Sequence, residues 1–263
     1  MINEDLNAEL RQKYNPDGSE LRRHQMDLLK VLDHFDSICK EHAIPYWLSS
    51  GTCIGAARHG GFIPWDDDID VEMLRDDYLK FLKVFKEDDD YVLQTYENDL
   101  FYTEPFPKLR YKKIEISEGD FDKKYTYHGL FVDIFVMEPA PLVPAAICHF
   151  FYGAMRHFSF KINTSNKLLV FAYKLWKCFN VWLVKFNRLL FGHVWKDTLR
   201  HTFGVGKVKK VRKRDEIFPL TNLEFEGKKY PVPGNYDMYL KRIYGDYMKL
   251  PDTLHTHHII DNM

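Results

Sequence analysis

Residues 51–73 read GTCIGAARHGGFIPWDDDIDVEM, and this stretch decides the fold. Four aspartates fall within five positions near its end: Asp66, Asp67, Asp68 and Asp70. The alternation DIDV at 68–71 has the period of a half-buried strand, which points the carboxylates of Asp68 and Asp70 to the same side. Like charges this close repel one another, so the pattern predicts a hard divalent cation that removes the repulsion.

An EF-hand calcium loop is the first alternative, because aspartates at 66, 68, 70 and 77 occupy ligand positions 1, 3, 5 and 12 of such a loop. However, Val71 stands at position 6, where the sharp turn requires glycine, and a β-branched residue resists positive φ. Position 12 is Asp77 rather than glutamate, and FIPW upstream is no helix. We therefore reject the EF-hand interpretation.

Small residues precede the aspartates in LSSGTCIGAARHGG, residues 48–61. The sequence predicts a strand, a tight turn at Gly51-Thr52 and a short helix after it. Such a turn presents backbone N–H groups to an anion, and the hydroxyls of Ser50 and Thr52 add donors. We expect Ser50, Gly51 and Thr52 to bind phosphate together with the nearby cation Arg58.

Further along the chain, LFVDIF at 130–135 places Asp133 alone in a strongly apolar strand. An unpaired buried carboxylate is costly, so Asp133 either pairs with a base or caps a backbone group, or is a third metal ligand beside Asp68 and Asp70. We favour the metal ligand. Lys108 and Arg110 are candidate phosphate clamps, with an ordinary strand edge as the alternative.

The whole chain, residues 1–263, is predicted to form a single domain. Its 45% hydrophobic and 16% aromatic content excludes the disordered class. A formal net charge of −1 gives no support for a nucleic-acid partner. Apolar spacing predicts a long helix over 19–42, and the strands interleaved with helices predict an α/β or α+β fold with a mixed sheet. The polar N-terminus and four widely spaced cysteines favour an intracellular protein whose thiols are reduced and buried.

From 142 to 205 the sequence predicts an aromatic-rich helical insertion with few acids. One interpretation is a buried helix that snorkels its lysines. The other is a helix lying on a membrane surface with its basic residues toward anionic lipid.

Gly-Thr, Asp-x-Asp and a later lone Asp together resemble the nucleotidyltransferase superfamily signature. The 51–73 stretch closely resembles the core motif of the LicD family, whose members include the fukutin-related proteins. GLFVDIFVMEPAP at 129–141 resembles its next block, and residues 215–251 resemble its C-terminal block. The cysteine cluster that binds zinc in the fukutin-related proteins has no counterpart here.

The resemblance implies a nucleotidyltransferase-like mixed sheet flanked by helices. It also implies transfer of a phosphorylated alcohol from a CDP-alcohol donor to a sugar hydroxyl of a glycan or glycolipid. Mg²⁺, with Mn²⁺ as an alternative, would be held by Asp68, Asp70 and Asp133, and Asp133 would also serve as general base. We expect a cytoplasmic location, with peripheral contact to the inner face of the cell membrane as an option. Two rival functions remain: nucleotide transfer from a nucleoside triphosphate to a small molecule, and a non-catalytic, cation-binding scaffold at the membrane.

Overall fold

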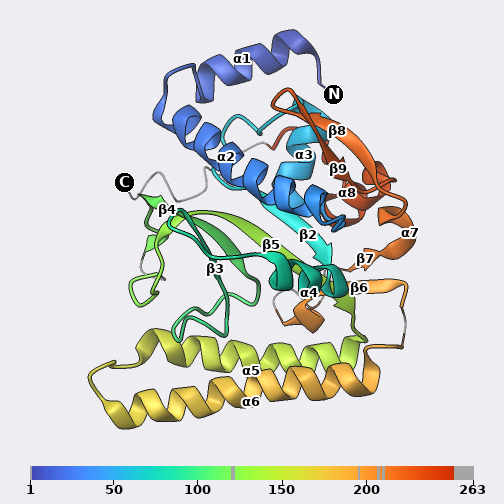
Figure 1. Ribbon diagram of the computed structural model, residues 1–263. Coiled ribbons are helices and arrows are strands. Elements are labelled where there is room, and N and C mark those ends of the chain that lie inside the picture. The colour runs from blue at the N-terminus through green and yellow to red at the C-terminus, as the bar shows by residue number, and fades with distance from the viewer. Residues whose placement is uncertain (1, 120–121, 195, 206–207, 209–210, 252–263) are drawn as a thin grey trace.

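The computed structural model describes residues 2–119, 122–194, 196–205, 208 and 211–251. A mixed sheet lies at its centre and is flanked by helices (Figure 1). The strands pair in the order β1-β2-β5-β4-β3, and β6 adds to β5 and carries β7. Among the described strands of this sheet, only β2 and β5 run parallel, and the other pairs are antiparallel. The predicted α+β class with a mixed sheet is therefore confirmed.

The sheet contains seven strands: β1 (Trp47–Leu48), β2 (Asp70–Leu74), β3 (Tyr91–Gln94), β4 (Lys108–Glu115), β5 (Gly129–Pro139), β6 (Thr198–His201) and β7 (Arg212–Lys213). A separate hairpin is formed by β8 (Thr221–Phe225) and β9 (Lys228–Val232). β5 is buried along nearly its whole length because it pairs on both sides, which explains its continuous apolar run.

The helices are α1 (Glu4–Tyr14), α2 (Glu20–Glu41), α3 (Ser50–His59), α4 (Arg75–Val84), α5 (Leu142–Lys161), α6 (Lys167–Phe191), α7 (Arg214–Ile217) and α8 (Tyr236–Tyr244). The predicted helix over 19–42 is α2. Ser19 caps its N-terminus by accepting from Arg22 N, and its apolar face packs on the main core with the sheet.

Two expectations are wrong in detail. Gly51 and Thr52 do not form a turn before a helix, because α3 begins at Ser50 and includes them. The 142–205 segment is not helical throughout: α6 ends at Phe191, and Thr198–His201 forms β6, which pairs with the end of β5.

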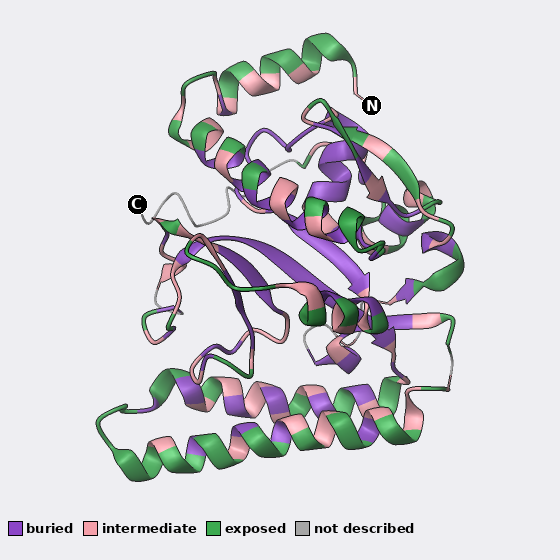
Figure 2. Cartoon of the chain, viewed as in Figure 1, coloured by how far each residue is buried: buried purple, intermediate pink, exposed green. Residues whose placement is uncertain are grey.

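The helices α5 and α6 pack side by side and run in opposite directions along one side of the molecule, away from α1 and α2 (Figure 1). They share a second hydrophobic cluster, distinct from the main core, built around Cys148, Tyr152, Met155 and Tyr173. Figure 2 shows that exposed residues line much of both helices. Among the helices that the structure describes, none is both long enough and apolar enough to cross a membrane.

Candidate active site

Asp70 and Asp133 lie opposite each other on the parallel strands β2 and β5. The backbone N–H of Asp133 donates to Ile69 O at 2.9 Å, which fixes the register of the two strands at this point. Residues paired across neighbouring strands point to the same face of a sheet, so the two carboxylates are neighbours. Because Asp70 begins a strand that pairs on both sides, this segment is not an EF-hand loop, as the sequence indicated.

The electrostatics of these carboxylates are those of a crowded acidic site. Burial raises the pKa of Asp70 well above its ordinary value, and the charges of Asp68, Asp133 and Asp66 raise it further. Burial likewise raises the pKa of Asp66, to which the charges of Asp68 and Asp67 add. The four aspartates of the DDDID run and Asp133 of β5 therefore crowd like charges into a mostly buried place, a cost that a bound cation would remove.

The donor atoms and the exposure of these aspartates show whether the site suits a metal ion. Carboxylate oxygens are the donors that Mg²⁺ and Mn²⁺ prefer, and Asp68 remains partly exposed beside the buried Asp70 and Asp133. Across the residues that the structure describes, no three His, Cys, Asp or Glu side chains already form a ready-made metal-binding group. The donor chemistry fits a divalent cation, and the ligand set stays a prediction.

The start of α3 holds Asp70 from the other side. Thr52 Oγ1 accepts from the backbone N–H of Asp70 at 2.8 Å, and Asp70 O accepts from Ser49 N at 3.0 Å. A hydrogen bond from Ser50 favours the charged form of Asp70 and so lowers its pKa, opposing the effect of burial. Ser50 itself has φ of 47°, in the left-handed region that costs energy for a residue with a side chain.

Gly51 lies where the helix start meets the acidic run. A Cβ at Gly51 would lie 2.7 Å from Asp66 Oδ2, closer than atoms can approach without a shift. Glycine therefore allows the Asp66 carboxylate to sit against the first turn of α3. Ser50, Gly51 and Thr52 do gather beside the aspartates, but the Thr52 hydroxyl is already used to position Asp70.

Arg58 lies at the other end of α3, where its side chain is buried in protein contacts. Its Nη1 donates to the carbonyl of Tyr247 at 2.6 Å, and its Nε donates to His59 Nε2 at 2.9 Å. These contacts tie the C-terminal block to α3. The Arg58 guanidinium is therefore already engaged by protein groups. Phosphate binding by Arg58 stays a prediction.

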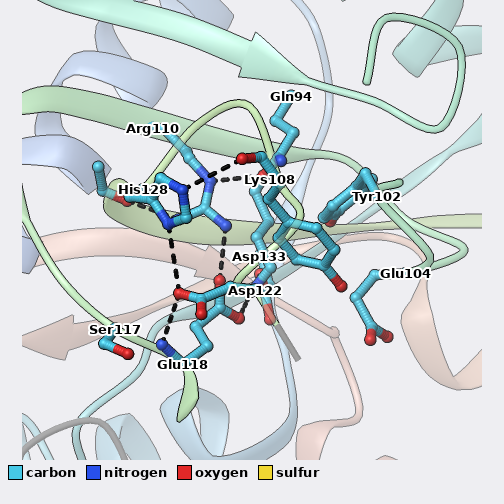
Figure 3. A network of polar contacts seen from close by, with 12 residues as sticks. Gln94, Tyr102, Glu104, Lys108, Arg110, Ser117, Glu118, Asp122, His128 and Asp133 are labelled. Atoms are coloured by element: carbon cyan, nitrogen blue, oxygen red, sulfur yellow. Dashed lines mark hydrogen bonds and ion pairs between the residues drawn. The ribbon is translucent and has the colours of Figure 1, made fainter. Parts of the chain in front are cut away.

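Lys108 pairs directly with Asp133 across β4 and β5. Its Nζ lies 3.0 Å from Asp133 Oδ1 and 2.9 Å from Glu118 Oε2, as Figure 3 shows. Burial raises the pKa of Asp133 to about 7, although the Lys108 ammonium opposes this. Lys108 is therefore a cation within contact of a site carboxylate.

Arg110 supports this arrangement from further inside. Its guanidinium donates to Gln94 Oε1 at 2.5 Å, to Gly129 O at 2.7 Å and to Glu118 Oε1 at 2.6 Å (Figure 3). It is fully buried, and its strand β4 pairs with both β3 and β5. The strand-edge alternative for Lys108 and Arg110 is therefore wrong, and Arg110 orients Glu118 beside Lys108.

The comparisons with known proteins agree with this geometry. A family model described as the LicD/FKTN/FKRP nucleotidyltransferase domain matches residues 43–143, which carry the aspartates of β2 and β5. The lipopolysaccharide cholinephosphotransferase LicD of Haemophilus influenzae is 32% identical over 262 residues, covering 91% of this chain and 96% of its own length. This chain belongs to the LicD family. It is accordingly an enzyme of the LicD phosphotransferase type.

More distant relatives match shorter stretches of this LicD-family chain. The mouse ribitol-5-phosphate transferase FKTN is 36% identical over 62 residues, covering 24% of this chain and 13% of its own. The human ribitol 5-phosphate transferase FKRP is 50% identical over 34 residues, covering 13% of this chain and 7% of its own. These short matches support membership of the family. They say less about the substrate than the match to the Haemophilus influenzae protein, which extends over nearly the whole chain.

Sequence reasoning missed a buried network behind the aspartates of the LicD-family site. Glu72 follows Asp70 by two positions and so faces the same side of β2. Its carboxylate is fully buried and accepts from a ring of donors: Trp47 Nε1 and Tyr239 O–H at 2.9 Å each, and Arg212 Nη2 at 2.8 Å, with His201 Nε2 also at 2.9 Å. Although burial raises the pKa of Glu72, Arg212 and the other donors outweigh it and hold the pKa at about 2.

This network brings the C-terminal block to the aspartates. Tyr239 on α8 donates to Glu72, and Tyr244 at the end of α8 lies close enough to Ser50 to share a hydrogen bond. The extension of DID to DIDVE was the only local signal for Glu72. Arg212 and His201 could not be found from spacing, because they arrive through the pairing of β6 and β7 far along the chain.

An apolar cavity lies elsewhere in the molecule. It has a volume of about 520 Å³ and lies between α4, α6 and the end of β5, with apolar side chains such as Leu79, Phe106 and Val184 in its wall. None of the aspartates discussed above lines it. We assign the chemistry to the aspartates on geometric and electrostatic grounds, since cavity size alone does not identify a reacting centre.

Proposed function

We propose that this protein transfers phosphocholine, or a closely similar phosphorylated alcohol, from a CDP-alcohol to a sugar hydroxyl of lipopolysaccharide or a related cell-surface glycolipid. The observation that carries the proposal is the paired Asp70 and Asp133 at the centre of a chain that aligns along nearly all of a lipopolysaccharide cholinephosphotransferase. The ribitol-phosphate relatives keep ribitol phosphate as an alternative cargo, but they align over short stretches only.

The reaction forms a bond between the acceptor oxygen and the phosphorus that carries the alcohol, and it breaks the bond from that phosphorus to the bridging oxygen of CMP. The acceptor hydroxyl must lose its proton to a base. We assign that role to Asp133, a buried carboxylate that lies opposite Asp70 on the neighbouring strand. Lys108, 3.0 Å from Asp133, would hold it in place and add positive charge beside the diphosphate.

Asp68 and Asp70, with Asp133, are the residues we propose to hold Mg²⁺, or Mn²⁺ in its place. When bound, the metal would neutralise charge on the diphosphate. The first turn of α3 lies beside these aspartates, and its backbone N–H groups would suit an anionic phosphate. We place the reaction on the cytoplasmic side of the cell membrane, where nucleotide-activated donors are made.

The test is a donor screen with purified protein, lipopolysaccharide and Mg²⁺. CDP-choline, CDP-ribitol, CDP-glycerol, CTP and ATP are supplied separately, and CMP, AMP and pyrophosphate are quantified with and without EDTA. The proposal predicts CMP and a choline-labelled glycolipid from CDP-choline, abolished by EDTA and restored by Mg²⁺ or Mn²⁺. Pyrophosphate from a triphosphate would instead assign nucleotide transfer. If no donor were consumed with any acceptor, the remaining rival would be a non-catalytic scaffold.

A further inference from the structure

The helix α6 carries apolar side chains on its outer side as well as on its inner side, where Val170, Trp176 and Leu183 pack against the second hydrophobic cluster. Its buried residues are mostly polar: Tyr173, Lys177, Asn180 and Asn187. A separate set of apolar residues faces outward along one stripe at helical spacing: Leu168, Phe171, Leu175, Phe179, Trp182, Phe186 and Leu189. Leu168 and Leu189 are 75% and 76% exposed, and Trp182 is 55% exposed. A surface helix of a water-soluble domain normally has polar residues on the side that faces solvent.

Specific contacts fix this orientation. Lys177 Nζ donates to the carbonyls of Asp99 at 2.7 Å and Leu100 at 2.8 Å, and it lies 4.2 Å from the ring centre of Tyr96. Arg188 Nη2 lies 2.8 Å from Glu138 Oε1 on β5. Turning the apolar stripe inward would break both sets of contacts. Lys177 therefore does not snorkel to solvent, and the outward stripe is a defined feature of the fold.

Aromatic rings continue the stripe from α6 onto α5. The rings of Phe151 and Phe179 lie 5.5 Å apart and join the two helices, and Phe150 lies 5.5 Å from Phe151. On α6, Trp182 lies 6.0 Å from Phe179 and 5.2 Å from Phe186. Exposed aliphatic side chains at Val143 and Ile147 extend the same surface along α5. We call this surface the outer face of the α5–α6 hairpin; the hairpin itself lies at the lower side of Figure 2.

The charged residues of the α5–α6 hairpin itself are all basic. Residues 139–196 contain no aspartate or glutamate. Lys167, Lys174 and Lys185 are exposed and lie within roughly 20° of one another around the helix axis, on one flank of the apolar stripe, at about 100° per residue. Such a flank complements an anionic surface. A second copy of the chain would bring lysines against lysines with no acid on the hairpin to pair with them.

We propose that the outer face of the α5–α6 hairpin binds the surface of an anionic lipid bilayer, lying in the plane of the headgroups. The exposed Leu, Phe and Trp side chains would enter the acyl boundary, and the flanking lysines would contact lipid phosphates. The proposal rests on the hairpin alone and goes beyond the transfer reaction. It would place the enzyme on the surface that carries glycolipids, whichever alcohol it transfers.

The first test is vesicle flotation with the full chain. One set of vesicles is phosphatidylcholine alone, and the other contains about a third phosphatidylglycerol, in the range of anionic membranes. We expect binding to the anionic vesicles to exceed binding to phosphatidylcholine at least roughly tenfold and to weaken as salt rises. The double variant Trp182→Gln/Phe186→Gln should lose binding to both, and Lys174→Gln/Lys185→Gln should lose it selectively on anionic vesicles, by roughly fivefold per lysine.

Matched controls come from elsewhere on the surface. Met238→Gln removes a similarly exposed apolar residue on α8, and Lys83→Gln removes an exposed lysine on α4. Both should float as the unaltered chain does. Far-UV circular dichroism melts of every variant check the fold, and we expect each to remain folded because all four hairpin substitutions are on exposed side chains.

A native cysteine offers a direct readout of depth. Cys178 is exposed on α6, whereas Cys39, Cys53 and Cys148 are buried. A polarity-sensitive maleimide should therefore label Cys178, and its emission should shift to the blue when anionic vesicles are added, but not in the Trp182→Gln/Phe186→Gln chain. Absence of both flotation and shift would overturn the proposal. So would a dimer in light scattering that the Trp182→Gln/Phe186→Gln substitutions convert to monomers, since the outer face would then be covered by a second copy.

Discussion

Asp70 and Asp133 are paired residue for residue across the only parallel strand pair of the central sheet among the described strands. The pairing sets two carboxylates side by side on one face, and burial raises the pKa of both. An arrangement that costs stability in the absence of a ligand persists when it serves binding or catalysis. The predictions below test what holds this pair in place.

Thr52 positions Asp70 through its hydroxyl. Thr52→Val keeps the shape of the side chain but leaves the buried N–H of Asp70 without an acceptor. We expect unfolding by urea to show a loss of about 1–3 kcal/mol and turnover to fall with it. Thr52→Ser, which keeps the hydroxyl, should be close to the unaltered chain in both measurements. Equal stability of the valine and serine variants would contradict the role assigned to this hydrogen bond.

Gly51 and Gly153 form a natural pair of substitutions to alanine. At Gly51 the added Cβ meets Asp66 Oδ2 at 2.7 Å, so we expect Asp66 to shift and turnover to fall roughly tenfold or more. At Gly153, inside α5, a Cβ meets nothing within 4 Å, and alanine should stabilise the chain by about 0.5–1 kcal/mol. Thermal melts and CMP release measure both. Unchanged turnover in Gly51→Ala would show that close approach of Asp66 is dispensable.

Arg212 carries the charge that keeps Glu72 ionised. Arg212→Met removes it and leaves a fully buried carboxylate without its arginine partner, so we expect a loss of about 3–5 kcal/mol in the free energy of unfolding. Lys30→Met breaks the exposed pair with Asp27 and should cost less than about 1 kcal/mol. If the two variants were equally stable, the Glu72 network would not be a stabilising part of the site.

His59 should make the chain sensitive to mild acid. Burial lowers the pKa of His59 to about 3, and its Nε2 accepts from Arg58 Nε while Nδ1 lies 2.7 Å from Asn7 Oδ1. The unfolded chain binds a proton at an ordinary histidine pKa near 6.5, so stability is lost as pH falls below that value. Between pH 7 and 5 this loss is about 2 kcal/mol.

The measurement is the free energy of unfolding of the unaltered chain and of His59→Gln across that pH range. Glutamine keeps a donor and an acceptor but takes up no proton, so the difference between the two chains should shrink steadily toward pH 5. A difference that stays constant with pH would show that His59 does not titrate in this way.

The sequence predicted what local patterns encode. The alternation at 68–71 predicted the strand that carries Asp70, although β2 begins at Asp70 and Asp68 precedes it. The apolar run around Asp133 predicted a central strand, and the spacing over 19–42 predicted α2. Strand order does not follow from local sequence. Lys108 and Arg110 could therefore be predicted only as phosphate-binding residues or as residues of an edge strand. The structure places β4 between β3 and β5, so β4 is not an edge strand. The orientation of α6 was open for the same reason, because the carbonyls that Lys177 contacts lie far away in sequence.

The helix start at Ser50 escaped prediction for a different reason. Gly-Thr is usually read as a turn, but here a left-handed residue at Ser50 begins α3 directly. In the Glu72 network, only Glu72 follows a local pattern, because it continues the alternation of Asp68 and Asp70. Arg212 is distant in sequence and reaches Glu72 only because β7 pairs with β6 in the sheet.

The most direct test of the account measures transfer and stability together for the central pair. Choline-labelled CDP-choline is incubated with lipopolysaccharide and the unaltered chain, Asp70→Asn or Asp133→Asn, and label in the glycolipid is counted beside a thermal melt of each protein. We predict that both variants lose at least about 100-fold in transfer. Asp70→Asn should melt at the same or a higher temperature because a buried repulsion is removed, whereas Asp133→Asn also takes a carboxylate partner from Lys108 and should not melt higher. Transfer within a few-fold of the unaltered chain in either variant would contradict the assignment of this pair as the reacting centre.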